Sequence, residues 1–221
     1  MSISKPNSNG RREKIAALLM ELRSLGVKDK KVLTAIEQVP REEFVPEALI
    51  HRAWENTALP IGRAQTISQP LVVALMTQAL QLDKSHKVLE VGTGSGYQGA
   101  VLARLAKRVY TIERHAVLLK EAESRFAALE LRNVITKLGN GFNGWPEVGP
   151  FPRIMVTAAA EELPQPLLDQ MEIGGRMVIP IGPVNGHQEI VLVERNEDGY
   201  STTPMGPVRF VPLVDEGPLR N

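Results

Sequence analysis

The chain has 221 residues, 43% of them hydrophobic and 23% charged, which suits one globular domain with a sizeable core. Its 26 Lys and Arg nearly balance 25 Asp and Glu, so the composition indicates neither a nucleic-acid groove nor a polybasic membrane surface. The absence of cysteine excludes disulfides, thiolate catalysis and cysteine-based zinc sites.

The first part of the chain is predicted to be mainly helical. Residues 1–10 are polar and lack the apolar segment of a signal peptide, so we expect a disordered tail on a soluble, cytoplasmic protein. Apolar residues at helical spacing predict a helix over 11–25, and a second helix between its cap Asp29 and its stop Pro40. A short helical piece follows over 46–53. No apolar run reaches the ~18 residues that span a bilayer, so no membrane contact is expected.

Residues 58–69 show neither a helical nor a strand period, and we predict a polar loop there. Pro70 then begins a helix, with Ser68 or Gln69 as its cap. A polar loop that leads into a helix presents hydroxyl and N–H groups to an anion. Thr66 and Ser68 are therefore either capping residues or part of an anion site, and their pattern alone leaves both interpretations open.

The stretch from Lys87 to Gly99 predicts a buried strand, a glycine turn and the start of a helix, which are the parts of a nucleotide cradle. Glu90 lies inside this strand, where a carboxylate is costly unless it is paired or faces a ligand. A second apolar run, 109–112, ends at Glu113, about 20 residues after the turn, where a ribose-binding carboxylate is expected. We therefore predict a nucleoside site.

Strands and helices alternate through the rest of the chain. Helices are predicted over 115–129 and 164–171, the second stopped by Gly174-Gly175, and strands over 134–138, 154–157 and 177–180. Alternation of this kind predicts a parallel sheet with right-handed crossovers and a ligand at the carboxyl ends of its strands. Two antiparallel strands, 189–195 and 208–213, with a turn at 196–199, should finish the sheet.

Several blocks resemble the protein-L-isoaspartate O-methyltransferase family over nearly the whole chain, from the second helix to Leu213. They are Leu59-Pro60-Ile61-Gly62, Gln65-Thr66-Ile67-Ser68-Gln69-Pro70, Val88-Leu89-Glu90-Val91-Gly92-Thr93-Gly94-Ser95-Gly96-Tyr97-Gln98, Val156-Thr157-Ala158-Ala159-Ala160 and Val208-Arg209-Phe210-Val211-Pro212-Leu213. The Gln-Thr-Ile-Ser-Gln-Pro block is specific to this family, whereas the glycine block alone would indicate only a Rossmann-like methyltransferase.

The resemblance implies an α/β fold of the Rossmann-like class I methyltransferase type. Its mostly parallel, twisted sheet would have helices on both faces, an N-terminal helical extension and antiparallel C-terminal strands. One methyltransferase domain would span 11–221, with 11–80 as a helical cap on the substrate side and 81–221 as the Rossmann-like core.

The resemblance also implies a reaction. The methyl donor would be S-adenosylmethionine, which leaves as S-adenosylhomocysteine. The acceptor would be the free α-carboxylate of an L-isoaspartyl residue in a damaged protein or peptide. The resulting ester collapses to a succinimide that can reopen as normal aspartate. We expect a monomer that uses no metal.

Family motifs carry roles over to individual residues. Glu113 would bind the ribose hydroxyls, Asn140 would face adenine, and Ser68, with Thr66 beside it, would occupy the active-site position. The implied donor-binding set is Glu90, Gly92, Thr93, Gly94, Ser95, Gly96, Glu113, Arg114, Asn140 and Gly141. The implied substrate-binding set is Ile61, Gln65, Ile67, Val211 and Pro212.

This chemistry needs few catalytic groups. A free carboxyl titrates near pKa ~4 and is ionised at pH 7, so no general base is required. The protein must mainly hold the acceptor oxygen in line with the methyl group, and Ser68 would donate a hydrogen bond to the acceptor without acting as a nucleophile. The four histidines show no metal-ligand spacing.

The chain departs from the family pattern at three places: Ala64 stands where glycine is usual, Asn140 where aspartate is usual, and Pro152-Arg153 after Phe151 where aspartate is usual. Two other functions stay open. Gly94-x-Gly96-x-x-Gly99 also fits a nicotinamide-dependent oxidoreductase, and a non-catalytic relative could bind isoaspartyl segments or the nucleoside without turnover.

Overall fold

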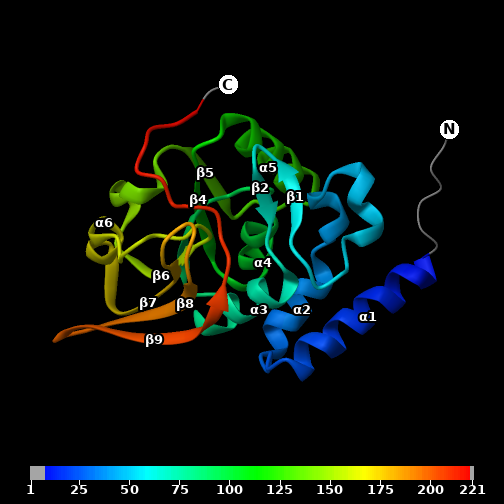
Figure 1. Ribbon diagram of the computed structural model, residues 1–221, viewed down its shortest axis with the longest axis horizontal. Coiled ribbons are helices and arrows are strands. Elements are labelled where there is room, and N and C mark those ends of the chain that lie inside the picture. The colour runs from blue at the N-terminus through cyan, green and yellow to red at the C-terminus, as the bar shows by residue number, and fades with distance from the viewer. Residues whose placement is uncertain (1–7, 220–221) are drawn as a thin grey trace.

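The computed structural model describes residues 8–219 of the chain. Its N-terminal part folds into helices and one β-hairpin (Figure 1). The elements are α1 (Ser8–Ser24), α2 (Lys30–Gln38), the 3₁₀ helices η1 (Arg41–Phe44) and η2 (Glu47–Arg52), β1 (Leu59–Gly62), β2 (Gln65–Ile67) and α3 (Pro70–Ala79). As predicted, the Asp29 carboxylate caps α2, accepting from the backbone N–H of Lys31 at 2.8 Å.

Two predictions for this part are corrected. Helix α1 begins at Ser8, so the predicted disordered tail, residues 1–10, is wrong for residues 8–10, while 1–7 lie outside the described residues. The predicted loop over 58–69 contains the antiparallel β1–β2 hairpin. Its strands are too short, and too interrupted by Pro60 and Gly62, to show a period of two. Helix α3 begins at Pro70, as predicted, and of the two candidate caps, Ser68 and Gln69, the structure has Gln69 at this position, without a side-chain capping bond.

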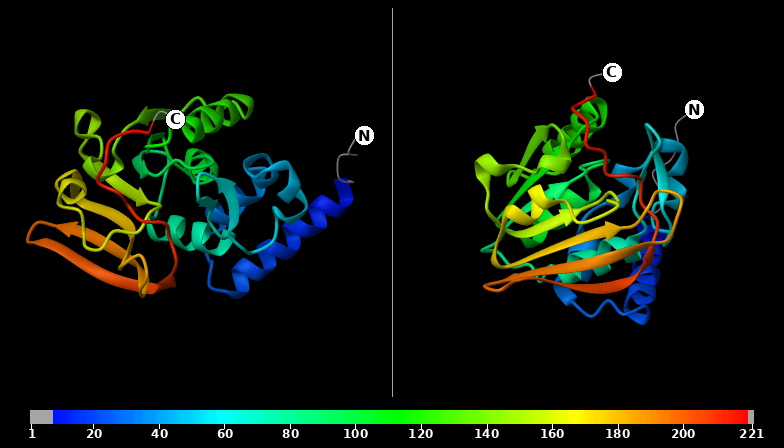
Figure 2. Two further views of the ribbon diagram at one scale, coloured as in Figure 1. Left: turned by 45° about the horizontal axis from the view of Figure 1, so that its top comes forward. Right: turned by 60° about the vertical axis from the view of Figure 1, so that its left-hand side comes forward.

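The rest of the chain forms a seven-stranded sheet in the order β5-β4-β3-β6-β7-β8-β9. The strands are β3 (Lys87–Val91), β4 (Arg108–Glu113), β5 (Val134–Leu138), β6 (Phe151–Val156), β7 (Met171–Ile181), β8 (Gln188–Asn196) and β9 (Gly199–Val208). The first five in spatial order run parallel, and β8 and β9 are antiparallel. The β8–β9 hairpin forms one outer edge of the sheet (Figure 2).

Between the strands lie α4 (Tyr97–Leu105), α5 (Ala116–Ala128), α6 (Gln165–Asp169) and the 3₁₀ helices η3 (Gly141–Asn143) and η4 (Pro146–Val148). The predicted strand over 134–138 is confirmed to the residue. The helix predicted over 115–129 is also present, and the observed α5 is one residue shorter than predicted at each end. The helix predicted over 164–171 is shorter, and Gly174-Gly175 lie inside β7.

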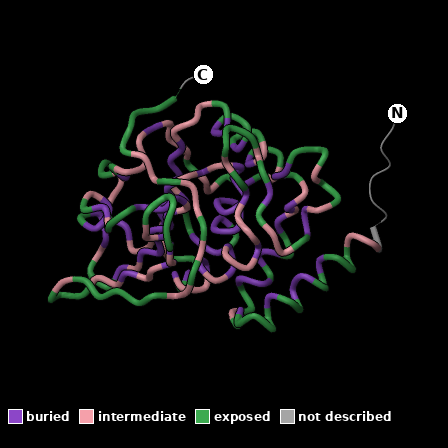
Figure 3. The backbone as a smooth tube through the Cα atoms, in the orientation of Figure 1, coloured by how far each residue is buried: buried purple, intermediate pink, exposed green. Residues whose placement is uncertain are grey.

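Alternating side chains of the strands give the sheet two buried faces, as a period of two requires. Val88, Val109 and Met155 pack into the cluster that includes helices α1 to α5. Their neighbours Leu89 and Ile154 belong to a second cluster that includes Leu167 and Leu168 of α6. Buried residues accordingly run through the centre of the molecule (Figure 3). The predicted fold class, α/β with a mostly parallel sheet between helices, is confirmed.

The predicted strand over 208–213 is wrong. Strand β9 ends at Val208, and the following residues 209–219, which we call the C-terminal segment, cross the carboxyl ends of the parallel strands (red in Figure 1). The segment is held at Ala159, whose N–H donates to the Val211 carbonyl at 2.8 Å and whose carbonyl accepts from Leu213 at 2.7 Å. Within residues 8–219, no helix combines the length and the apolar character needed to cross a membrane.

Candidate active site

A pocket lies at the carboxyl ends of β3, β4 and β6. Strand β3 lies between β4 and β6, so β4 and β5 follow on one side of it and β6 and β7 on the other. Open α/β sheets bind ligands where the strand order reverses in this way. The pocket is lined by 65–68, 91–95, 112–115, 157–158 and 210–214, together with Val73, Tyr97, Gln98 and Gly141. Five separate segments of the chain therefore meet at one place.

The glycine turn after β3 forms one wall. Gly92 has φ +96°, and a Cβ there would lie 2.3 Å from the hydroxyl of Thr157. That hydroxyl donates to the Gly92 carbonyl at 2.7 Å, so the end of β6 fixes the turn. Gly96 has φ +91° and packs against Phe126 on the far side. Glycine is therefore required at both positions by the left-handed backbone and by the close packing against Thr157 and Phe126.

Glu113 ends β4 beside this turn and is 6% exposed. One of its carboxylate oxygens accepts from the Gly94 N–H at 2.8 Å, and the other accepts from the His115 N–H at 2.9 Å. A carboxylate has about four acceptor sites, so capacity remains for the hydroxyls of a ribose. A glycine wall, a nearby helix N-terminus at Tyr97 and a buried carboxylate fit a nucleoside donor such as S-adenosylmethionine.

The opposite wall comes from the hairpin. Ile67 is buried, Gln65 and Ser68 are partly buried, and Thr66 is exposed, yet all four line the pocket. The carbonyl of Ser68 accepts from the Arg41 guanidinium at 2.8 Å. The residues that the family resemblance assigned to the acceptor thus face the glycine turn across one pocket.

The C-terminal segment closes the remaining side. Phe210 to Val214 line the pocket, and the segment is fastened further along by Glu216, which pairs with Arg114 at 2.8 Å. The sequence prediction included Val211 and Pro212 but missed Phe210, Leu213 and Val214. Apolar residues such as these are typical of a buried strand, and only the path of the chain in the structure shows that they line a pocket.

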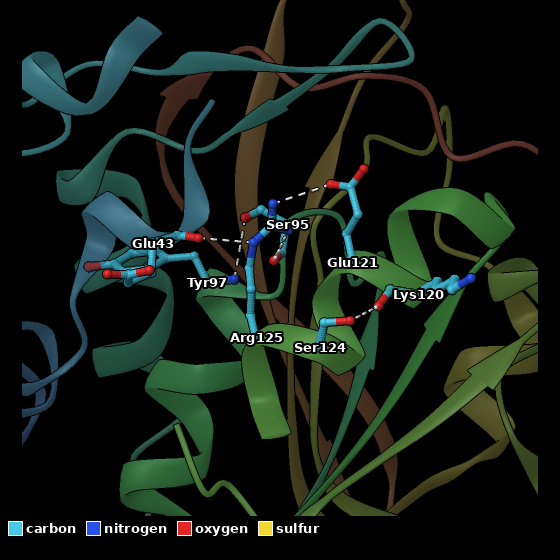
Figure 4. A network of polar contacts seen from close by, with 7 residues as sticks. All are labelled: Glu43, Ser95, Tyr97, Lys120, Glu121, Ser124 and Arg125. Atoms are coloured by element: carbon cyan, nitrogen blue, oxygen red, sulfur yellow. Dashed lines mark hydrogen bonds and ion pairs between the residues drawn. The ribbon is translucent and has the colours of Figure 1, made fainter. Parts of the chain in front are cut away.

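An arginine on α5 ties the glycine turn to the N-terminal helices (Figure 4). Arg125 donates to the Ser95 carbonyl at 3.1 Å and to the Glu43 carbonyl at 2.9 Å, and it pairs with Glu121 at 3.2 Å. Because Ser95 belongs to the turn and Glu43 to η1, this side chain joins the donor side of the pocket to the N-terminal helical part of the chain.

Most residues predicted from the sequence come together. Those that line the pocket are Gln65, Thr66, Ile67, Ser68, Gly92, Thr93, Gly94, Ser95, Glu113, Arg114, Gly141, Val211 and Pro212. Ile61, Glu90, Gly96 and Asn140 do not line it. Ile61 lies next to it, since its Cδ1 is 3.7 Å from where a Cβ of Gly94 would be.

Glu90 is completely buried under α4, away from the pocket lining. Its Oε2 lies 2.8 Å from the position that a Cβ of Gly99 would occupy, so glycine makes room for it. Within residues 8–219, neither carboxyl oxygen has a hydrogen-bond partner. Burial raises the pKa of Glu90 to about 8; the nearby Thr111 hydroxyl acts in the opposite direction, and the charge of Glu113 adds to the rise. Glu90 therefore lies beneath the glycine turn and α4, and not in the pocket where its predicted contact with the donor would be made.

Asn140 also differs from expectation. Its side-chain carbonyl accepts from the Phe142 N–H at 3.0 Å and caps η3. Its amide nitrogen donates to Asp215 of the C-terminal segment at 2.7 Å. The side chain predicted to face adenine is therefore engaged at both ends by the protein, while its neighbour Gly141 lines the pocket.

The family model for protein-L-isoaspartate(D-aspartate) O-methyltransferases matches residues 13–217. The chain belongs to this family. Among similar proteins, the protein-L-isoaspartate O-methyltransferase of Rhodospirillum rubrum is 61% identical over 206 residues, covering 92% of this chain and 94% of its own length. That of Paramagnetospirillum magneticum is 56% identical over 203 residues, covering 91% of this chain and 95% of its own length.

Solved structures agree. A protein-L-isoaspartate O-methyltransferase superposes with a TM-score of 0.82 at 29% identity, covering 90% of this chain and 65% of the other. A protein of this name from Plasmodium falciparum, solved with S-adenosyl-L-homocysteine, superposes with a TM-score of 0.79 at 25% identity, covering 90% of this chain and 98% of the other. The predicted family and methyltransferase class are confirmed, and the nicotinamide alternative is set aside.

Proposed function

We propose that this protein transfers the methyl group of S-adenosylmethionine to the α-carboxylate of L-isoaspartyl residues in damaged proteins and peptides, as its family does. One observation carries the proposal: the glycine turn with Glu113 and the hairpin with Ser68 line the same pocket. Donor and acceptor would therefore meet between two walls of different chemistry. The family assignment and the relatives named above support the same reaction.

The donor wall comprises the turn 92–96 and Glu113. The turn residues 92–95, which line the pocket, would lie along the donor, and the carboxylate would accept from its ribose hydroxyls. S-adenosylmethionine supplies a methyl group already activated by its sulfonium charge. Glu113 is kept in place for this role by the two N–H groups that it already binds.

The acceptor wall comprises Gln65, Thr66, Ile67 and Ser68. An isoaspartyl carboxylate is ionised at pH 7, so the protein's task is orientation and exclusion of water. The Ser68 hydroxyl would donate to one acceptor oxygen and hold the other in line with the methyl group. The apolar residues of the C-terminal segment would cover the pocket and keep water from the reacting atoms.

The deciding experiment is a methyl-transfer assay with an isoaspartyl peptide and its aspartyl counterpart as control. We expect methyl ester on the first peptide only. Thermal unfolding with S-adenosylhomocysteine or NAD gives an independent reading, with a raised melting temperature for the first ligand alone. Donor binding without ester formation would instead identify a non-catalytic relative.

We also propose that the protein acts as a monomer in the cytoplasm, without nucleic acid or membrane, and that 11–80 serves as the substrate-side cap of the core 81–221. The near-zero net charge supports the absence of nucleic-acid and membrane partners, and the position of the hairpin opposite the glycine turn supports the role of 11–80 as a cap. Light scattering after gel filtration tests the monomer. A mass of twice 24.3 kDa would contradict it.

A further inference from the structure

Arg41 is a fully buried cation at the start of η1. Its guanidinium donates to the Ser68 carbonyl at 2.8 Å and to the Thr57 carbonyl at 3.4 Å. Thr57 precedes β1 and Ser68 follows β2, so one side chain joins the two ends of the β1–β2 hairpin at its base.

The same guanidinium lies 4.7 Å from the ring centre of Tyr97, within cation–π distance. Tyr97 is 1% exposed, begins α4 directly after the glycine turn, and lines the pocket. Arg41 therefore contacts one residue of the acceptor wall and one residue next to the donor wall. It lies behind the pocket and is not part of its lining.

The charge of Arg41 is not matched by a carboxylate. Within residues 8–219 it forms no ion pair, and its Nε and Nη1 have no hydrogen-bond partner. Burial accordingly lowers its pKa. Burying an uncompensated charge is costly. Only two main-chain hydrogen bonds and the Tyr97 ring offset that cost, so the position of Arg41 is best explained by what these contacts hold together.

We propose that Arg41 is a positioning residue for methyl transfer, which fixes the Ser68 backbone and thereby the direction of the Ser68 hydroxyl. The inference rests on the function proposed above for Ser68. Arg41 holds Ser68, which orients the acceptor. Because Arg41 also contacts the Tyr97 ring, Ser68 is kept at a constant distance from the glycine turn.

The test is a double-mutant cycle on kcat for an isoaspartyl peptide, with the variants Arg41→Met, Ser68→Ala and both together. Arg41→Met should lower kcat by roughly 10- to 100-fold, as expected for lost orientation, with the dissociation constant of S-adenosylhomocysteine unchanged. Because Arg41 acts through Ser68, its replacement should have almost no further effect in the Ser68→Ala background.

Arg125→Met is the matched control, since it also removes an arginine that binds two main-chain carbonyls, here Ser95 of the glycine turn and Glu43 of η1, neither of which belongs to the β1–β2 hairpin. Its effect should multiply with that of Ser68→Ala. Arg41→Gln, which keeps a donor for the Ser68 carbonyl, should recover part of the lost kcat. It also serves as the test variant if Arg41→Met does not fold.

Three results would overturn the proposal: full multiplication of the Arg41 and Ser68 effects, a parallel loss of S-adenosylhomocysteine binding, or wild-type kcat in Arg41→Met. An inactive parent protein would count against the proposed function itself. In that case amide hydrogen exchange would test the structural part of the proposal, namely that Arg41 fixes the Ser68 backbone. Faster exchange confined to 57–68 in Arg41→Met would support it, and unchanged exchange there would refute it.

Discussion

Asn140 and Asp215 are joined by a hydrogen bond of 2.7 Å, in which the side-chain amide donates to the carboxylate. The bond links the turn after β5 to the C-terminal segment that covers the pocket. The amide and the carboxylate form a pair, so a change of residue 140 alone also alters the contact that Asp215 makes.

Asn140→Asp should weaken binding of S-adenosylhomocysteine, because it places two carboxylates against each other and loosens the C-terminal segment. Repulsion of like charges at this exposed position should cost about 1 kcal/mol, or roughly five-fold in affinity. The exchanged variant, Asn140→Asp with Asp215→Asn, should restore binding. Calorimetric titration of the three proteins checks this, and tighter binding by the single variant would show that residue 140 faces adenine after all.

Glu113→Ala should raise the dissociation constant of S-adenosylhomocysteine by ten-fold or more, since hydrogen bonds to a charged group contribute ~1.5–3 kcal/mol each. The substitution also releases the N–H groups of Gly94 and His115, so the glycine turn should lose order as well. Titration calorimetry measures the affinity. Glu197→Ala, in the distant β8–β9 turn, is the control and should bind normally. Wild-type affinity in a folded Glu113→Ala protein would remove this residue from the site.

Glu90 should make stability depend on pH. Its pKa is about 8 in the folded protein, against 4.5 for an exposed glutamate side chain. The unfolded chain therefore releases its proton first, and the stabilising effect of the buried neutral acid, complete below pH 4.5, is lost as pH rises through 8. Over that window the free energy of unfolding should fall by on the order of a few kcal/mol.

Glu90→Gln keeps the shape without the titration, so its urea-unfolding midpoint should change much less between pH 5 and pH 9 than that of the parent. Parallel pH curves for the two proteins would mean that Glu90 does not titrate in this range.

Ala64→Gly should stabilise the protein. Arg63 and Ala64 form the two-residue turn of the β1–β2 hairpin, with φ of +51° and +55°. This left-handed backbone is strained for alanine by about 1–2 kcal/mol but free for glycine. The greater freedom of glycine in the unfolded chain offsets part of the gain, which leaves an increase of about 0.5–1 kcal/mol. Thermal unfolding should show a higher melting temperature for Ala64→Gly, and Ala58→Gly, outside the turn, should show none.

Sequence reasoning located the donor wall well and the other walls less well. Strand β3, the glycine turn and Glu113 follow from local signals: an apolar run, glycines, and an acid at the next strand end. The hairpin was missed because its turn residues, Arg63 and Ala64, are not typical of left-handed backbone. The C-terminal segment was predicted as a strand because its apolar residues resemble core, and its path depends on contacts with Ala159 far away in the sequence.

The burial of Arg41 and of Glu90 could not be predicted from the sequence either, because it also depends on contacts with residues far away in the sequence. Arg41 follows a proline in a polar stretch, and nothing local distinguishes it from a surface arginine. Glu90 was recognised as unusual inside its strand, but whether it faces the ligand or α4 depends on Gly99 of the packed helix. Such residues are identified only once the tertiary structure brings their partners together.

Among residues 8–219, no strand pairs with the outer side of β9, which leaves one edge of the seven-stranded sheet open. An open edge is a template on which strands of other molecules can add, which is a common route to aggregation. Pro204 and Pro207 are exposed on this strand and have no N–H to offer a neighbour. A protein that handles damaged, partly unfolded chains meets many loose strands. These two prolines should keep it from joining them to its own sheet.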